Sequence, residues 1–270
     1  MTRASLPRVT LACIDCADPR LAVRAMRISM SHCDFAAAKF FTDAAHAASF
    51  AEGGIDCVPI AAVKSSADYS RFVMKDLVGY LDTDFVQLVQ WDGYVTNGAA
   101  WTDEFLECDY VGARWFFRET NNVGNGGFSL RSRRLLEALR DPLIDAADPE
   151  DVAICVTHRG FLEHAYRIRF ATAELADRYA FEGTLRKGNE FGFHRIFNLP
   201  FFHGEAELAQ LLDGMPEERF ATPASVTLVK YLSNLGRQRE ALRYAQRLRA
   251  NHAAYSALPQ GFRALLDSVH

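Results

Sequence analysis

Apolar positions along this chain alternate between short continuous runs and longer segments with helical spacing. A short apolar run bounded by polar residues predicts a buried strand, and apolar residues spaced three and four apart predict a helix. Helices with one apolar side are predicted at residues 20–30 and 69–81. A buried strand is predicted at residues 9–14, and further strands at residues 35–41, 57–60 and 85–89. This alternation predicts an α/β fold with a mostly parallel sheet flanked by helices.

The second half of the chain continues this pattern and then changes character. Pro149 begins a predicted helix at residues 150–165, and residues 227–248 are an Ala/Leu/Arg-rich helical hairpin that resembles one tetratricopeptide unit. One such unit forms no solenoid, so we expect it to pack on the main domain, with partner docking as the alternative. We expect a catalytic domain at residues 1–215 and a helical appendage at residues 216–270. Shorter elements are predicted at residues 128–130, 168–170 and 191–197 as strands and 132–139 as a helix.

Composition and charge exclude several classes of protein. A chain of 270 residues that is 49% hydrophobic buries a substantial core. Its net charge of -4 gives no electrostatic footprint for nucleic acid. The apolar run before Asp15 is too short for a signal peptide or a membrane span, which predicts a cytoplasmic protein. The six cysteines lie mostly among apolar neighbours and predict reduced thiols, since the Cys13/Cys16 pair has no second pair to complete a zinc site.

Polar residues follow two of the predicted strands. Asp15 comes directly after residues 9–14, and Asp92 comes shortly after residues 85–89. The carboxyl ends of parallel strands meet at one edge of a sheet, where α/β proteins bind their ligands. We therefore expect a single site that also includes a glycine turn, an acidic pair and a late histidine. Its candidate residues are Gln90, Trp91, Asp92, Asn125, Gly126, Gly127, Phe128, Glu150, Asp151 and His194.

These residue types suit the transfer of a sugar from a nucleoside diphosphate. The leaving diphosphate gains negative charge, which a divalent cation held by Asp92 and His194 would stabilise. Gly126 and Gly127 would let backbone N–H groups approach the donor or the acceptor. Asp151, beside Glu150, would accept the proton of the acceptor hydroxyl as a general base.

Each of these features also has a purely structural interpretation. Asn-Gly-Gly is a common hairpin turn. Carboxylates such as Glu150 and Asp151 favour a helix N-terminus by about 0.3–1 kcal/mol without any catalysis. His194 lies between two phenylalanines and fits a buried core histidine. The order of the segments along the chain favours the functional interpretation.

With these motifs in view, residues 9–199 resemble the GT-A glycosyltransferase superfamily, and more closely a bacterial family of glycosyltransferase-like domains with Q-W-D-G, G-N-G-G-F-S-L-R-S and P-E-D motifs. The resemblance implies a GT-A-like fold and a metal-binding D-x-D motif at Gln90–Asp92, completed by His194. It also implies a glycine-rich donor and acceptor loop and a base in the P-E-D motif. The nucleotide-sugar contacts that it implies are Asp15, Tyr69, Arg71 and Lys75.

Gln90 departs from the D-x-D pattern, because an amide binds a divalent cation less well than a carboxylate. We therefore expect weak binding of Mn²⁺ or Mg²⁺. The donor implied by the resemblance is a UDP-sugar or a similar nucleotide sugar, and the acceptor is a glycan or a lipid-linked hydroxyl in polysaccharide biosynthesis. A base at Asp151 favours inverting hexosyl transfer, and Trp115 offers a surface on which a sugar or base stacks.

Two other functions are compatible with the sequence. One is a non-catalytic nucleotide-sugar-binding or scaffolding protein, favoured by Gln90, whose C-terminal helices recruit a protein partner. The other is a nucleotidyltransferase, but residues 16–19 lack the glycine-rich and basic phosphate loop that this class carries after its first strand.

Overall fold

The computed structural model describes residues 3–50 and 53–269. The chain forms two compact units, Met1–His194 and Arg195–His270. The predicted boundary lay between residues 215 and 216, but the 3-10 helix Ile196–Phe201 packs with the second unit, where Phe197 and Phe201 contact the ring of Tyr231. Among the described residues, no helix is both long and apolar enough to cross a membrane.

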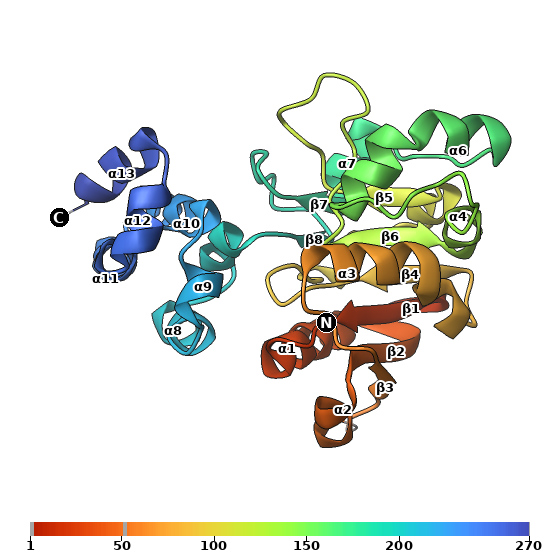
Figure 1. The fold of residues 1–270 in the computed structure, drawn as a ribbon, viewed down its shortest axis with the longest axis horizontal. Helices are drawn as coiled ribbons and strands as arrows, with labels where there is room; N and C mark the ends of the chain where they lie inside the picture. The colour runs from red at the N-terminus through yellow and green to blue at the C-terminus, as the bar shows by residue number, and fades with distance from the viewer. Residues whose placement is uncertain (1–2, 51–52, 270) are drawn as a thin grey trace. The chain divides into compact units, whose positions relative to one another are not determined.

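The first unit is built on a six-stranded sheet of order β3-β2-β1-β4-β6-β5 (Figure 1). The pairs β2–β3, β1–β2 and β1–β4 are parallel, whereas β6 runs antiparallel to β4 and to β5. This arrangement confirms the predicted α/β class with a mostly parallel sheet. The strands are β1 (Ala4–Ile14), β2 (Cys33–Asp43), β3 (Asp56–Ile60), β4 (Phe85–Leu88), β5 (Tyr110–Gly112) and β6 (Ser129–Ser132).

Helices cover the sheet with two sets of buried side chains. Ala12 and Ile14 of β1 belong to a core that includes Leu77 and Leu136, contributed by the segments that follow β3 and β6. Helix α1 packs on β1 and β2 through a separate buried side that includes Met26. The helices of this unit are α1 (Pro19–His32), α2 (Ala44–Phe50), α3 (Ser66–Arg71), α4 (Arg133–Ala138), α5 (Glu150–Val152), α6 (Arg159–Ala165) and α7 (Ala173–Tyr179), with short 3-10 helices at Leu77–Tyr80, Gly98–Ala100 and Asp103–Glu107.

The strand order places a topological switch between β1 and β4. From β1 the chain proceeds outward through β2 and β3 and then returns to add β4 on the other side of β1. Open α/β sheets bind ligands at such a reversal, outside the carboxyl ends of the two central strands. Asp15 and the segment 90–92 follow these two strands, as the sequence pattern predicted.

A small second sheet adds a strand pair beside this edge. β7 (Ala180–Phe181) and β8 (Gly192–Phe193) are parallel, with Phe181 opposite Phe193. Gly192 forms an antiparallel β-bridge with Val95. The Phe193 ring packs edge-on against the Tyr94 ring, with ring centroids 4.8 Å apart. The pair is thereby attached to the segment that follows β4.

Several predicted elements differ from the structure. The helices predicted at residues 69–81 and 150–165 are each interrupted by a π-helical turn, Phe72–Asp76 and Ala153–Thr157. The strand predicted at residues 168–170 is wrong: the segment makes one bridge, between Phe170 and Tyr110, after Arg167 turns the chain with φ 55°. The strand predicted at residues 191–197 is reduced to β8.

The second unit is helical. α10 and α11 form the predicted hairpin, and Gly236 between them takes φ 74°, the left-handed conformation that commonly ends helices. Its helices are α8 (Glu205–Leu212), α9 (Glu217–Phe220), α10 (Pro223–Asn234), α11 (Gln238–Ala250), α12 (His252–Ala257) and α13 (Gln260–Asp267).

Candidate active site

Strand register brings two of the predicted segments together. Leu88 at the end of β4 pairs with Ser129 at the start of the antiparallel β6. The residues after β4 and before β6 therefore emerge at the same edge. The backbones of Gln90 and Gly93 exchange hydrogen bonds of 2.9 and 3.0 Å, which closes a tight turn with Trp91 and Asp92 at its corner.

The second sheet brings a histidine and a glutamate to this turn. Glu182 follows β7 and His194 follows β8, so the parallel register that pairs Phe181 with Phe193 also sets these two residues side by side. A carboxylate oxygen of Glu182 lies 3.5 Å from His194 Nδ1. Both side chains are largely buried. Glu182 was absent from the predicted site.

The other nitrogen of His194 faces the turn after β4. Nε2 lies 3.2 Å from Gln90 Oε1 and 3.7 Å from Asp92 Oδ1. Each ring nitrogen therefore meets a different acidic side chain, Glu182 at Nδ1 and Asp92 at Nε2. A carboxylate at one imidazole nitrogen sets the tautomer and the orientation of the ring, which controls what the other nitrogen binds.

The predicted glycine bend lies against this histidine. Asn125 adopts φ 72°, a left-handed conformation that asparagine tolerates. Its side-chain oxygen accepts the Gly127 N–H at 3.2 Å, and its amide nitrogen donates to Glu182 at 3.2 Å. A Cβ atom on Gly127 would collide with His194 Nε2, and one on Gly126 would collide with the Glu150 carboxylate. Only glycine allows these approaches.

The acidic pair divides into two different environments. Asp151 is half-buried, and its Oδ2 accepts the Gly126 N–H at 3.0 Å. Glu150 is only 5% exposed and accepts from Nη2 of the fully buried Arg131 at 2.7 Å. Burial raises the pKa of Glu150, and the Arg131 guanidinium opposes this shift. Asp151 thus accepts a hydrogen bond from the bend on its partly exposed side, and Glu150 packs against the bend on its buried side.

Of the predicted nucleotide contacts, Tyr69 lies at this cluster. Burial raises the pKa of Tyr69, the nearby Glu150 carboxylate adds to the shift, and Gln90 lies close to the hydroxyl. Within the described part of the chain, the buried hydroxyl has no hydrogen bond of acceptable geometry. Asp15 lies at the end of β1, where its side chain accepts the N–H groups of Ala17 and Asp18 at 2.7 and 2.9 Å.

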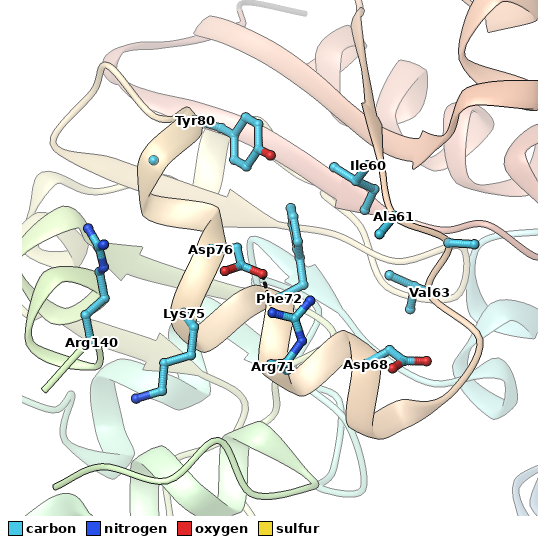
Figure 2. Close-up of a pocket in the computed structure, with 12 residues that line it drawn as sticks. Ile60, Ala61, Val63, Asp68, Arg71, Phe72, Lys75, Asp76, Tyr80 and Arg140 are labelled. Carbon is cyan, nitrogen blue, oxygen red and sulfur yellow. Dashed lines mark hydrogen bonds and ion pairs between the residues drawn. The ribbon is translucent and has the colours of Figure 1, made fainter. Parts of the chain in front are cut away.

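Arg71 and Lys75 line a different hollow, beside the loop after β3 (Figure 2). This cavity has a volume of about 500 Å³. Arg71 turns toward Asp76, with which it forms an ion pair at 2.8 Å. Lys75 donates to the carbonyl oxygens of Leu139 and Ile144, each at 2.5 Å. These contacts of Arg71 and Lys75 are structural, and the nucleotide-binding role of both residues stays a prediction.

The predicted aromatic contacts lie at different depths. Phe128 is fully buried and stacks on Tyr179 with ring centroids 5.1 Å apart, so it belongs to the core. Trp115 is also buried, and its indole covers Gly124 at the start of the bend. Trp91 is half-buried at the corner of the turn after β4.

The donor set at this edge fits a weakly held cation. Asp92 Oδ1, His194 Nε2 and Gln90 Oε1 face one another, but only Asp92 supplies a charge. Across residues 3–50 and 53–269, no group of three or more His, Cys, Asp and Glu side chains is arranged to hold a metal ion. Glu182 reaches the far side of the imidazole, so it supports the histidine rather than joining the donor set.

Two residues of the cluster were not among the predicted site residues. Arg131 was visible as the penultimate residue of the G-N-G-G-F-S-L-R-S motif, where an arginine in a buried strand signals an ion-pair partner. Glu182 had a weaker signal, an acidic residue after the apolar pair Ala180–Phe181. Neither signal identifies the partner, because the partner is set by tertiary contacts.

The residues that form this edge lie mostly within a segment that matches a protein family. The family model described as protein of unknown function (DUF5672) matches residues 54–195. No curated protein matches the chain significantly.

Solved structures with similar folds include two glycosyltransferases. The mannosyltransferase PcManGT from Pyrobaculum calidifontis, in complex with GDP-Man and Mn²⁺, is 13% identical, with a TM-score of 0.46 over 99% of this chain and 88% of that chain. The apo-form glycosyltransferase GlyE of Streptococcus pneumoniae TIGR4 is 15% identical, with a TM-score of 0.45 over 86% of this chain. The matched part is 64% of the GlyE chain, so this chain spans less than two thirds of that length.

Proposed function

The chain belongs to the family described as protein of unknown function (DUF5672), and from the site in this region we propose that it transfers a sugar from a nucleoside-diphosphate donor to a hydroxyl acceptor. The observation that carries the proposal is the convergence of Asp92, the Gly126–Gly127 bend, Asp151 and His194 at the switch between β1 and β4. Asp92 and His194 are more than a hundred positions apart in the chain. Hydrogen bonds, one close ionic contact and glycine-dependent approaches link the residues of the site.

The proposed reaction assigns the proton to Asp151. As the acceptor oxygen forms its bond to the anomeric carbon, the bond between that carbon and the diphosphate oxygen breaks. The acceptor proton passes to Asp151, whose Oδ2 is held by the Gly126 N–H and keeps a second lone pair. Glu150 is occupied by Arg131, so the base function falls on Asp151 alone. Displacement of this kind inverts the anomeric configuration.

The remaining residues bind and orient. We assign contacts with the nucleoside and the donor sugar to Asp15 and Tyr69. The Tyr69 hydroxyl lies close to Gln90 and, within the described residues, has no hydrogen bond of acceptable geometry. Asp92 and His194, with Gln90, would hold a divalent cation, which when bound would neutralise charge on the diphosphate. With one carboxylate in that set, we expect weak affinity, in the millimolar range. We propose further that the donor is a UDP-sugar and that the acceptor is a glycan or a lipid-linked hydroxyl.

Replacing Asp151 with Asn tests the assignment of the base. General base catalysis contributes roughly 10²–10⁴-fold, so we expect the transfer rate of D151N to fall by this factor. The amide oxygen of Asn replaces only one of the two carboxylate oxygens that accept the Gly126 and Val152 N–H groups. Loss of the other hydrogen bond costs about 0.5–1.5 kcal/mol, so the melting temperature should fall slightly while donor affinity stays unchanged. Diphosphate release from purified protein measures the rate, and NMR of the product measures the anomeric configuration. Normal turnover in D151N would remove Asp151 from the mechanism.

The cation is tested separately. Mn²⁺ at ten times its dissociation constant should raise the free energy of unfolding by about 1.4 kcal/mol, measured as a thermal shift. The shift should be absent in H194A, which removes the imidazole. Full activity in excess chelator would show that the reaction needs no metal.

A non-catalytic nucleotide-sugar-binding protein is the second candidate. Gln90 in place of a carboxylate favours it, because the weak cation site is poorly suited to an activated leaving group. Such a protein would show a thermal shift with nucleotide sugars and release no nucleoside diphosphate. The transferase releases diphosphate at a rate that depends on the acceptor.

A further inference from the structure

Two loops beside the site carry large apolar side chains that face solvent. Residues 113–124 lead from β5 to the glycine bend, and residues 182–190 connect β7 to β8. Phe116 and Phe117 in the first loop are 71% and 65% exposed, and Leu185 in the second is 88% exposed. Isolated exposed apolar residues are common, whereas a group on neighbouring loops marks an interaction surface.

The two loops are in contact. The Phe116 ring lies directly on the backbone of Gly183, where a Cβ atom would collide with it. Phe117 stacks on the buried Trp115 with ring centroids 5.8 Å apart. The aromatic side chains are therefore supported from below and remain exposed above. We call Phe116, Phe117 and Leu185 the apolar rim.

The apolar rim is connected to the candidate active site. Asn125, at the end of the first loop, donates to Glu182, at the start of the second. Glu182 in turn contacts His194. A molecule that covers the rim therefore lies next to the place where the acceptor would enter.

Basic side chains accompany the apolar rim. Arg118 lies directly after Phe117, and Arg186 and Lys187 follow Leu185 in positions that are largely exposed. Lys187 also contacts Asp177 at 3.1 Å. Of the acidic residues in these loops, Glu182 and Glu190 are largely buried and Glu119 is exposed. The outer side of the two loops therefore carries Arg118, Arg186 and Lys187 against Glu119, in a chain whose net charge is -4. Exposed aromatic and aliphatic tips flanked by Arg and Lys fit the interface of an anionic bilayer, where the apolar groups enter the headgroup region and the cations meet the phosphates.

We propose that the apolar rim and its basic flank bind the surface of an anionic lipid bilayer. The benefit to catalysis, access to an acceptor anchored in that bilayer, rests on the proposed function, whereas lipid binding itself does not. An aliphatic side chain exposed like Leu185 offers a polar glycan nothing to bond with, and hydrocarbon is its natural partner.

Sedimentation of the intact protein with vesicles tests this proposal. The vesicles contain equal parts of phosphatidylcholine and phosphatidylglycerol, or phosphatidylcholine alone. We expect binding to the anionic vesicles that weakens as salt is raised. The variant F116S/F117S should bind at least about tenfold less, because each ring loses its apolar contact with lipid. R118Q/R186Q should bind about fivefold less for each charge removed.

The variant L143S is the matched control, since Leu143 is 74% exposed in a different loop, and it should bind like the original protein. Equal binding to both vesicle types, no binding, or dimers that disappear in F116S/F117S would overturn the proposal. Transfer to a soluble acceptor is measured in parallel. Vesicle binding without transfer would remove the proposed function and keep the lipid surface, and transfer without vesicle binding would do the reverse.

Discussion

At the scale of single residues, the glycine bend is the most constrained point of the site. Gly126 and Gly127 are in contact with two segments from other parts of the chain, the Glu150 carboxylate and the His194 imidazole. Neither glycine has a positive φ, so their role is close approach and not backbone conformation. The same two residues also present N–H groups to Asp151 and to Asn125.

We therefore expect G126A to lower the free energy of unfolding by about 1–3 kcal/mol, because the added methyl group displaces the buried Glu150–Arg131 pair. Chemical denaturation measures this change. The matched control is G160A: a Cβ on Gly160 in helix α6 meets no atom, and alanine there should be neutral or stabilising by up to about 1 kcal/mol. Equal stability of the two variants would contradict the packing assigned to the bend.

Glu182 is proposed to position His194 without touching substrate. In E182Q the amide retains the contact with Asn125 but loses the charge beside Nδ1. We expect a change in the tautomer populations of His194, measured by ¹⁵N chemical shifts of the ring. Affinity for Mn²⁺ should fall by about 10–100-fold.

The control for this variant is E119Q, an exposed glutamate in the loop of residues 113–124, for which we expect neither change. Unchanged ring shifts in E182Q would mean that Glu182 does not set the orientation of His194. Loss of folding in E182Q is excluded by comparing melting temperatures with the original protein.

At the scale of elements, two helices beside the site each contain a π-helical turn. Phe72–Asp76 follows α3, and Ala153–Thr157 follows α5. π-Helical turns occur frequently at functional sites. Ser70 at the end of α3 accepts the backbone N–H of Glu150 at 3.1 Å, which ties the two helical segments together. The acidic pair is thereby held at a defined position relative to Tyr69.

Lys75 of the first π-helical turn links this turn to another part of the chain. Its ammonium group donates to two carbonyls in the segment after α4, so it joins two elements. Hydrogen bonds to a charged group contribute about 1.5–3 kcal/mol, and we expect K75M to lower the free energy of unfolding by this amount. Donor affinity should stay unchanged, as measured by isothermal titration.

K64M is the control for that experiment, because Lys64 is exposed and lies before α3. If K75M instead loses donor binding and keeps its stability, the nucleotide contact implied by the resemblance is correct and the structural role is minor. The two outcomes therefore separate the sequence-based role from the role that the contacts suggest.

Elements were predicted with uneven success, for physical reasons. The strands β1 to β4 were all located from their apolar runs. In β4 and the second half of β1 the run is buried on both faces, whereas the edge strand β3 has no buried residue. The π-helical turns were not predicted, since one extra residue per turn barely changes the spacing of apolar positions. Residues 168–170 are apolar in part but make a single bridge, so β-propensity alone misassigned them.

At the scale of the whole molecule, the chain combines an α/β unit with a helical unit. The sequence pattern places the change of character at residue 216, whereas the two compact units meet between His194 and Arg195. Residues 196–201 contain a Pro and several aromatics, a composition that does not reveal which unit they join. Their contacts with Tyr231 decide the matter.

By itself, the sequence determined the fold class and the main strands and pointed to the segments of the candidate site, because apolar periodicity and glycine, proline and acidic positions act locally along the chain. Only the tertiary structure decided that Glu182 lies beside His194, that Arg131 pairs with Glu150, and that Lys75 joins two elements. Each is a contact between distant residues, set by strand register and by the direction of a side chain. A linear pattern specifies neither of these.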